Sequence, residues 1–354
     1  MKRIVLTGGG TAGHVTPNLA LIPRLIKDGW DVHYIGAADS VEERLIQAVD
    51  GVAYHAVACG KLRRYFDVKN LTDPFKVIQG VAQARKLLGE LKPNVVFSKG
   101  GFVSVPVVYG ARMNKIPVVS HESDMTPGLA NRLTAPFVDV LCCSFPEAAK
   151  LAGKKGLHTG TPIRPEILQG DRQRGLKRFG FKDGIPVIMV TGGSSGAVAI
   201  NDAVIAALPK LAESFQILHL CGPNNFNASV EGTPNYTQCE YLDEGMAEAY
   251  ACADMLVSRA GANTLCEIVA LRKPALLIPY PKGASRGDQL VNAQSFVERG
   301  LAHRLLQEDL SGQSLYDAII RLYTQRGALY EAMDREPGAN GLENVLAQIY
   351  KSAK

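Results

Sequence analysis

A histidine stands at the end of a glycine-rich turn near the start of the chain. The stretch TGGGTAGHVTP, Thr7 to Pro17, follows an apolar segment at 3–7 and precedes a helix-like segment at 17–28. Glycines let the backbone turn sharply and let a ligand approach it closely. The partial positive charge at a helix start disfavours a protonated imidazole, so we expect His14 to stay neutral and to act as a general base. The alternative is a histidine that only caps the turn.

Two further glycine turns follow strand-like segments in the second half of the chain. The turn TGGSSGA at 191–197 offers backbone N–H groups and the hydroxyl of Ser194, which together suit a phosphate group. The turn SRAGANTLCE at 258–267 begins a helix whose first N–H groups could hold a diphosphate. Glu267 lies about one turn into that helix, where its carboxylate could accept hydrogen bonds from both hydroxyls of a ribose. The alternatives are a tight turn with capping serines and an exposed helix glutamate.

Two polar side chains could complete a site for a nucleotide sugar. Gln289 lies at the start of a helix-like segment at 288–299, where its amide could bind sugar hydroxyls. Arg164 lies in a segment with two prolines and could reach a phosphate. The chain has no D-x-D metal motif, so we expect helix N–H groups and arginine, rather than Mg²⁺, to stabilise a leaving diphosphate. These features describe a nucleotide-sugar enzyme without a metal cofactor.

The elements that must position these turns alternate between strands and helices. Val- and Ile-rich strands that are each followed by a glycine and a helix indicate parallel βαβ units, wound into open sheets with helices on both faces. The expected strands are 3–7, 31–36, 94–99, 117–121 and 140–144, then 186–192, 216–222, 255–261 and 275–280. The expected helices are 17–28, 41–49, 75–91 and 103–113, then 197–212, 245–252, 262–271 and 288–299. We therefore predict an α/β protein with two Rossmann-like domains that face each other across a cleft.

The domains are joined by HTGTPIRPEI at 158–167, because its prolines and glycine favour neither helix nor strand. The last helical segment has no strand after it and could pack on either domain. A length of 354 residues is enough for two cores.

Composition excludes several classes of protein. The chain is 46% hydrophobic and 21% charged, which is unlike a disordered tail or a coiled coil. Its net charge of +5 is mild, and no nucleic-acid-binding signature accompanies it. Apolar runs are shorter than the roughly 18–20 residues of a membrane span, and the first residues lack a signal-peptide core, so we expect a cytoplasmic protein. Seven scattered cysteines without a C-x-x-C pair indicate buried free thiols.

Seven motifs together resemble a known family. They are GGTAGHVTP at 9–17, SKGGFVSVP at 98–106, HESDMTPGLANR at 121–132, GTPIR at 160–164, TGGSSGA at 191–197, SRAGANTLCE at 258–267 and SRGDQLVNA at 285–293. The same motifs occur in the same order in the MurG family of glycosyltransferases, and the resemblance spans nearly the whole chain. It implies the GT-B fold, with two Rossmann-like domains whose parallel sheets face each other across a cleft. It also implies an acceptor- and membrane-binding domain at 1–161, a UDP-sugar donor domain at 162–339 and a final helix, 340–354, that packs back on the first domain.

The resemblance implies an inverting transfer of N-acetylglucosamine from UDP-GlcNAc. The acceptor is the C4 hydroxyl of N-acetylmuramic acid in undecaprenyl-linked lipid I, and the product is lipid II, with no metal cofactor strictly required. His14 is the implied base, and the implied acceptor residues are Thr11, Gly13, Glu122 and Asn131. The implied donor residues are Arg164, Ser194, Leu242, Ala262, Asn263, Thr264, Leu265, Glu267 and Gln289. The family often has two glutamines where this chain has Asp288 and Gln289, so only Gln289 is carried over.

A lipid acceptor calls for contact with a membrane. In the segment 61–79, Arg63 and Arg64 could attract anionic headgroups, while Tyr65, Phe66 and Phe75 could enter the interface. Phe75 also belongs to a helical stripe with Ile78 and Ala82, and for this stripe we favour packing against the sheet. We expect a peripheral protein on the cytoplasmic face of the cell membrane, with an anionic membrane surface as partner. Cell-wall assembly proteins are possible further partners.

Three other functions are compatible with parts of the pattern. Another GT-B enzyme, such as a diacylglycerol glycosyltransferase, would share the fold, the donor site and a membrane acceptor. A non-catalytic nucleotide-sugar sensor would share the donor site but would not need His14. An NAD-linked oxidoreductase is supported only by the G-x-G-x-x-G spacing of Gly8, Gly10 and Gly13.

Overall fold

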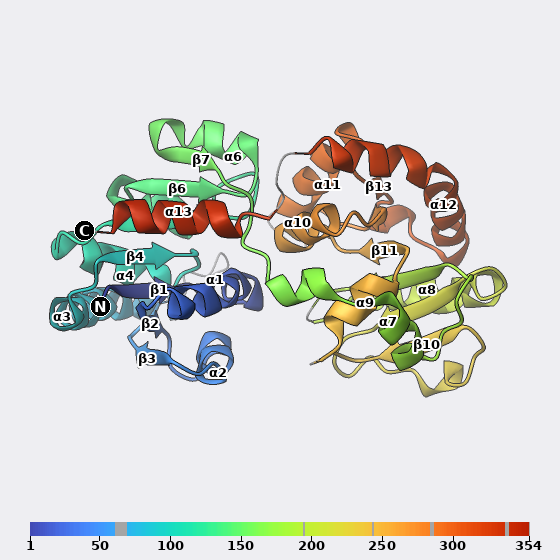
Figure 1. The fold of residues 1–354 in the computed structure, drawn as a ribbon, viewed down its shortest axis with the longest axis horizontal. Helices are drawn as coiled ribbons and strands as arrows, with labels where there is room; N and C mark the ends of the chain where they lie inside the picture. Colours follow the sequence, from blue (N-terminus) through green and yellow to red (C-terminus); the bar gives the residue numbers. More distant parts are fainter. Residues whose placement is uncertain (61–68, 194, 243, 284–286, 337–339, 354) are drawn as a thin grey trace. The chain divides into compact units, whose positions relative to one another are not determined.

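The chain folds into two compact units. The structure is a computed structural model that describes residues 1–60, 69–193, 195–242, 244–283, 287–336 and 340–353, with the backbone alone for 69–74. The first unit comprises Met1–Arg164 and Asn340–Lys354, and the second comprises Pro165–Ala339. The boundary lies within the segment 158–167 that we predict as the linker. Each unit is a parallel sheet with helices packed against it (Figure 1).

The described residues of the first unit form seven parallel strands in the order β3-β2-β1-β4-β5-β6-β7. The strands are β1 (Arg3–Thr7), β2 (Asp31–Gly36), β3 (Val52–Ala56), β4 (Val95–Ser98), β5 (Val118–Glu122), β6 (Val140–Cys143) and β7 (Gly156–His158). The helices are α1 (Thr16–Lys27), α2 (Val41–Gln47), α3 (Lys69–Leu91), α4 (Ser104–Met113), α5 (Leu129–Thr134), α6 (Pro146–Leu151) and α13 (Leu342–Ser352). The central strands are apolar and buried because helices cover both faces of the sheet.

The described residues of the second unit form six parallel strands in the order β10-β9-β8-β11-β12-β13. The strands are β8 (Val187–Thr191), β9 (Gln216–Leu220), β10 (Tyr236–Cys239), β11 (Met255–Ser258), β12 (Ala275–Leu277) and β13 (His303–Arg304). The helices are α7 (Arg172–Phe179), α8 (Val198–Leu211), α9 (Met246–Cys252), α10 (Ala262–Ala270), α11 (Asp288–Glu298) and α12 (Gly312–Asp334). The predicted α/β class with two Rossmann-like, parallel-sheet domains is confirmed.

Several elements are absent from the sequence prediction. They are the strands β3, β7, β10 and β13 and the helices α5, α6, α7 and α12. Of these, α12 is the longest, and a capping box between Ser311 and Ser314 begins it. The short strands lie at the edges of their sheets, where few apolar side chains are needed to bury them.

The last helix belongs to the core of the first unit. On α13 the side chains of Val345, Leu346 and Ile349 are buried among those of α1 and the central strands. The ring of Tyr350 stacks on that of Trp30 with 5.6 Å between the centroids. These contacts bury the apolar face of α13, so the end of the chain stabilises the unit that contains its beginning (Figure 1).

One packing prediction is wrong. Phe75 and Ile78 on α3 are 74% and 67% exposed, so their stripe does not pack against the sheet. A different face of the helix, with Ala84 and Leu88, is buried against α4. Gly80 lies four residues before Ala84 on this face, and a Cβ there would collide with the Ala58 carbonyl, so the face with small residues is the one that approaches the rest of the unit.

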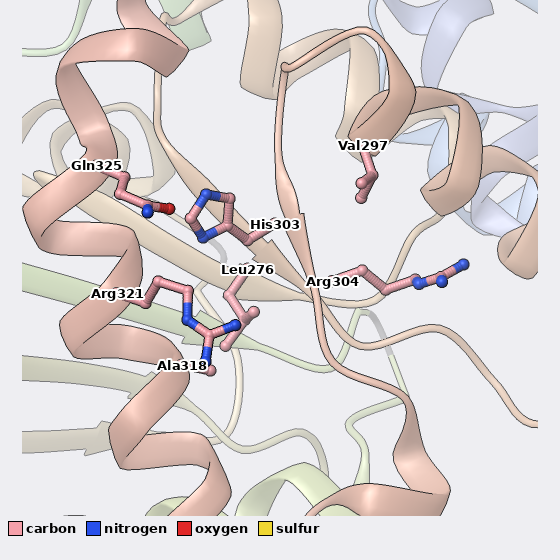
Figure 2. A pocket seen from close by; sticks show the side chains of 7 residues that line it. All are labelled: Leu276, Val297, His303, Arg304, Ala318, Arg321 and Gln325. Atoms are coloured by element: carbon pink, nitrogen blue, oxygen red, sulfur yellow. The ribbon is translucent and has the colours of Figure 1, made fainter.

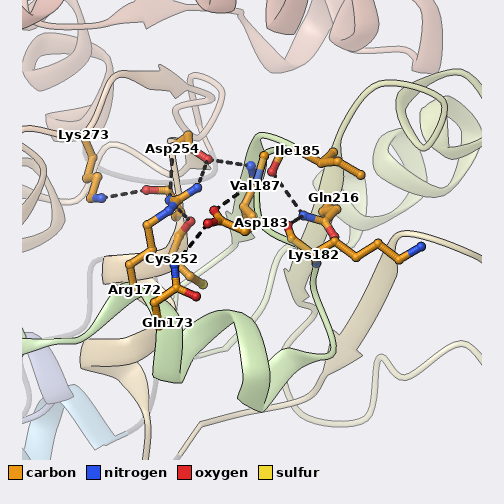
Figure 3. A network of polar contacts seen from close by, with 12 residues as sticks. Arg172, Gln173, Lys182, Asp183, Ile185, Val187, Gln216, Cys252, Asp254 and Lys273 are labelled. Carbon is orange, nitrogen blue, oxygen red and sulfur yellow. Dashed lines mark hydrogen bonds and ion pairs between the residues drawn. The ribbon is translucent and has the colours of Figure 1, made fainter.

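A polar network fixes α7, the first α-helix of the second unit, to the amino ends of its sheet (Figure 3). Arg172 on α7 donates to the carbonyl of Cys252 at 2.7 Å and to the carboxylate of Asp254 at 3.2 Å. The same carboxylate accepts the backbone N–H of Val187 at 2.8 Å. Asp254 therefore connects the start of β8 to α7 and stabilises the segment that follows the linker.

Candidate functional site

Three turns meet at the edge of the first sheet that is formed by the carboxyl ends of its strands. They follow β1, β4 and β5, which are parallel and adjacent in the middle of the sheet. The backbone N–H of Lys99 donates to the carbonyl of Thr7 at 2.8 Å. A Cβ at Gly101 would collide with the Gly9 carbonyl, so glycine is required where the first two turns touch.

His14 ends a short 3-10 helix, Ala12–His14, that connects the glycine turn to α1. Its ring is half-buried, and Nδ1 lies 2.8 Å from the hydroxyl oxygen of the exposed Thr11. The tautomer with the proton on Nδ1 donates to this hydroxyl and leaves Nε2 as the proton acceptor. In this tautomer Thr11 orients the ring in the manner that a general base requires. Gly13 lies between them in the chain and is exposed.

Glu122 and Asn131 form one buried cluster at the end of β5. The Glu122 carboxylate is 4% exposed and accepts the N–H groups of Asp124 at 3.0 Å and Gly128 at 2.9 Å. It also accepts the side-chain amide of Asn131 at 2.8 Å. Glu122 therefore holds the loop before α5 in place, and Asn131 is fixed by that carboxylate and by the carbonyl of His121.

Lys99 is a buried cation at this edge and is not among the predicted site residues. Its side chain is 2% exposed, and its ammonium donates to the hydroxyl of Ser123. Burial, and next to it the charge of Lys99, lower the pKa of His121 well below its usual value. The signal in the sequence was a lysine within a glycine turn after an apolar strand. Its positive charge suits an anionic ligand at the same edge.

Glu42 on α2 is a second residue that the sequence does not reveal. Its carboxylate is fully buried and accepts the backbone N–H groups of Gly10 at 3.1 Å and Ala37 at 3.4 Å. In a dinucleotide-binding fold a pyrophosphate would lie beside this glycine turn. The carboxylate takes up the N–H of Gly10, so this N–H is not available to the pyrophosphate of a dinucleotide.

The second unit places its candidate residues at the carboxyl ends of β8, β11 and β12, which are neighbours in the sheet. In the turn after β8, the N–H of Gly193 donates to the hydroxyl of Thr191 at 3.2 Å. Ser194 lies outside the described residues. The turn after β11 leads through Gly261 directly into α10, so no side chain at the cap position competes for the first helix N–H groups.

The first residues of α10 include apolar side chains that are buried and polar side chains that are partly exposed at this edge. Ala262 and Leu265 are buried, whereas Asn263 and Thr264 are half-buried. Glu267 lies at the start of the second helix turn, and its carboxylate accepts the hydroxyl of Tyr250 at 2.8 Å. A tyrosine hydroxyl donating to one oxygen fixes the orientation of the carboxylate.

Three further predicted donor residues lie on separate elements. The Oε1 atom of Gln289, in the first turn of α11, accepts the N–H of Tyr280 at 3.2 Å. Leu242 is half-buried between β10 and α9. Arg164 is the last residue of the first unit's main segment, and within the described part of the chain its buried Nε has no hydrogen-bond partner.

Arg259 supports this edge, although it is not among the predicted donor residues. Its side chain is 6% exposed and donates to the carbonyls of Ile278 at 3.0 Å and Pro279 at 3.3 Å. The guanidinium stacks on Tyr280, 4.1 Å from the ring centroid, and burial lowers its pKa. Arg259 thus positions the segment whose N–H group binds Gln289.

Most of the predicted membrane residues lie outside the part of the chain that the structure describes. The candidate membrane residues Arg63, Arg64, Tyr65 and Phe66 lie outside the described residues, whereas Phe75 is described and exposed.

Within the described ranges, no helix has the length and apolarity that a membrane crossing needs. Among the same residues we find no group of three histidine, cysteine, aspartate or glutamate side chains that could hold a metal ion.

Comparison with known proteins gives matches along the whole chain. The N-terminal domain of glycosyltransferase family 28 matches residues 4–141, and its C-terminal domain matches residues 187–349. A protein of Clostridium tetani named UDP-N-acetylglucosamine--N-acetylmuramyl-(pentapeptide) pyrophosphoryl-undecaprenol N-acetylglucosamine transferase is 48% identical over 99% of this chain and 98% of its own length. A protein of Lachnoclostridium phytofermentans with the same name is also 48% identical over the same shares.

Solved structures show the same fold. The crystal structure of Acinetobacter baumannii MurG superposes with a TM-score of 0.75 at 24% identity and covers 99% of this chain and 100% of its own. The calicheamicin glycosyltransferase CalG4 superposes with a TM-score of 0.71 at 13% identity and covers 99% of this chain and 98% of its own. The predicted GT-B class is thereby confirmed.

Proposed function

The chain belongs to glycosyltransferase family 28, and from this premise we propose that it transfers N-acetylglucosamine from UDP-N-acetylglucosamine to undecaprenyl-pyrophosphoryl-N-acetylmuramyl-pentapeptide. The observation that carries the proposal is the similarity, along both units, to enzymes that bear the name of this reaction. The product is the lipid-linked disaccharide that supplies peptidoglycan synthesis.

The first unit supplies the groups that activate the acceptor. The C4 hydroxyl of the muramyl sugar attacks C1 of the donor sugar and gives its proton to Nε2 of His14, while the C1–O bond to UDP breaks. Thr11 holds the ring through Nδ1. The exposed Gly13 and Thr11 border the acceptor pyrophosphate, toward which the buried charge of Lys99 is favourable. Glu122 acts through Asn131 and the loop that it orders.

The second unit supplies the groups that hold the donor. The N–H groups at the start of α10, at Ala262 to Leu265, hold the diphosphate together with Ser194. Arg164, the last residue of the first unit's main segment, is the additional cation of the proposal. Glu267 binds the ribose hydroxyls, and the backbone near Leu242 contacts the uracil. Gln289 binds the sugar hydroxyls. Because these donors already neutralise the departing UDP, the reaction needs no metal ion in this proposal.

Membrane contact is a further part of the proposal. The acceptor carries an undecaprenyl chain, which is confined to the bilayer. The exposed side chains of Phe75 and Ile78 on α3 can enter the interface, and Arg85 and Lys86 are exposed on the same helix. We infer that the protein binds the cytoplasmic surface of the membrane peripherally, through α3 and the preceding segment with Arg63, Arg64, Tyr65 and Phe66.

An assay that compares two acceptors tests the proposal. Purified protein is incubated with UDP-N-acetylglucosamine and either a short-chain lipid I analogue or diacylglycerol, with and without EDTA, and UDP release is measured. We expect release with the lipid I analogue alone, unchanged by EDTA. Release with diacylglycerol would assign the other lipid glycosyltransferase function, and binding of the donor without release would assign a sensor. Loss of activity in EDTA would contradict the metal-free reaction.

A further inference from the structure

Two adjoining hollows open on the second unit beside its edge strand. Their volumes are about 290 and 600 Å³, and both are lined by Val297 at the end of α11, His303 on β13 and Gln325 on α12. Gly300 and Ala302, in the segment that leads into the amino end of β13, line the larger hollow. The proposed donor residues follow the carboxyl ends of the strands instead, so these hollows are not part of the donor site.

The smaller hollow carries positive charge. Figure 2 shows Arg321 and Gln325 extending from α12 toward the side where His303 lies, whereas Arg304 extends away from them. Arg304 donates to the side chain of Gln294 at 2.6 Å. Among the described residues, no acidic side chain forms an ion pair with Arg321. The pKa of His303 is lowered by burial and, next, by the charge of Arg321.

No aspartate, glutamate, lysine or arginine is among the described residues that line the larger hollow. Its wall includes Ala302, Ala328 and Leu329, and two glycines line it as well. Small residues of α12 and of the segment before β13 thus make up much of the wall. An apolar body fits such a wall, and a charged group does not.

We propose that the two hollows together bind an amphipathic anion, a molecule with a phosphate or carboxylate group attached to an apolar body. The anionic group accepts hydrogen bonds from the guanidinium of Arg321 and the amide of Gln325, beside His303. The apolar body lies along Ala302 and Ala328. Hydrogen bonds from a guanidinium to an oxyanion are among the stronger ones in proteins, so Arg321 dominates the affinity.

A histidine-detected titration tests the site directly. The full-length protein, labelled in its histidine rings and saturated with UDP to occupy the donor site, is titrated with phenyl phosphate and followed by NMR. The His303→Gln variant identifies the His303 signal. We expect this signal to shift saturably with phenyl phosphate, less with inorganic phosphate and not with phenol, and its titration midpoint to rise. An unmoved His303 signal, or equal shifts with phenol, would overturn the proposal.

Matched variants locate the charge that matters. Arg321→Gln should weaken phenyl phosphate binding about tenfold or more. Arg326→Gln is the control, because Arg326 lies on the same helix but stacks on Tyr323 at 3.9 Å and lines neither hollow. Equal affinity in all three proteins would contradict the assignment of Arg321.

Vesicles distinguish the two sources of such a ligand. Wild-type protein and Arg321→Gln are sedimented with vesicles of dioleoylphosphatidylglycerol. Weaker sedimentation of Arg321→Gln than of the wild type assigns the site to a membrane lipid headgroup. Equal sedimentation, with phenyl phosphate binding retained in the wild type, assigns it to a soluble anion.

Discussion

At the scale of single residues, the contact between Thr11 and His14 gives the imidazole a defined orientation. A general base contributes when its accepting nitrogen is aimed at the proton that it removes. The 2.8 Å contact to Nδ1 leaves Nε2 for this purpose in one of the two neutral tautomers. In this role the hydroxyl acts through the ring.

Replacing His14 by alanine removes the proposed base. We expect kcat with the lipid I analogue to fall by about 10²–10⁴-fold, whereas the affinity for UDP, measured by calorimetry, stays the same. Thr11→Val keeps the ring and removes only the hydroxyl, so its loss should be smaller. An activity of His14→Ala within a few-fold of the wild type would show that another group accepts the proton.

A second histidine gives a prediction for pH. His219 is buried in the second unit, where its ring nitrogens lie 2.8 Å from the Tyr236 hydroxyl and 3.0 Å from Asn201 Oδ1, and burial lowers its pKa from 6.5 to about 4. The unfolded chain binds a proton in this window and the folded chain does not, so stability falls as the pH drops from about 6.5 to about 4. The loss from this residue alone is about 3 kcal/mol.

Calorimetry checks this contribution. His219→Gln replaces the two ring nitrogens by an amide N–H donor and a carbonyl acceptor, and it does not titrate. The midpoint temperature of its unfolding should therefore fall less than that of the wild type between pH 7 and pH 4.5. Parallel pH curves for the two proteins would contradict the assignment.

The sequence identifies the residues that follow strand ends but not those that support them. His14, Glu267 and Gln289 are recognisable because each follows an apolar run and a glycine turn. Glu42 and Arg259 act through backbone groups far away along the chain. No local pattern contains such partners, so only the folded structure reveals their roles.

At the scale of elements, α13 connects the end of the chain to its first core. Its amphipathic pattern is visible in the sequence, but either domain could have received it. The buried face formed by Val345, Leu346 and Ile349 packs within the first unit. In contrast, α12 was not predicted because its apolar positions are interrupted by Gly327 and by charged residues.

Truncating a side chain on α13 should therefore destabilise one unit. Leu346 is 1% exposed, and we expect Leu346→Ala to lower the free energy of unfolding of the first unit by about 2–5 kcal/mol. Glu343→Ala is the control, because its ion pair with Arg24 is exposed and screened by solvent, so its loss should change stability little. An equal effect of Leu346→Ala on the calorimetric transition of the second unit would contradict the assignment of this helix.

The exposed face of α3 gives the second prediction for an element. The double variant Phe75→Ser, Ile78→Ser should bind anionic vesicles about tenfold or more weakly, because both apolar side chains leave the interface. Leu151→Ser on α6 removes a side chain of similar exposure, 67%, and serves as the control. Sedimentation with vesicles measures the difference, and equal binding of all three proteins would remove α3 from the membrane contact.

At the scale of the whole molecule, the chain repeats one architecture with different chemistry in each unit. Both sheets are parallel, so both collect their functional turns at the carboxyl ends of neighbouring strands. The first unit offers an imidazole and a buried lysine there, and the second offers helix N–H groups and a fixed carboxylate. The alternation of strands and helices predicts this duplication, because each βαβ unit has a clear pattern in the sequence.

The stereochemistry of the product tests the proposed reaction most directly. Attack by an acceptor hydroxyl activated by His14 displaces UDP in one step and inverts C1 of the transferred sugar. With UDP-N-acetylglucosamine and the lipid I analogue, we expect one UDP released for each product molecule, and NMR should show a β linkage to O4 of the muramyl sugar. An α linkage, or UDP release without a disaccharide product, would contradict this mechanism.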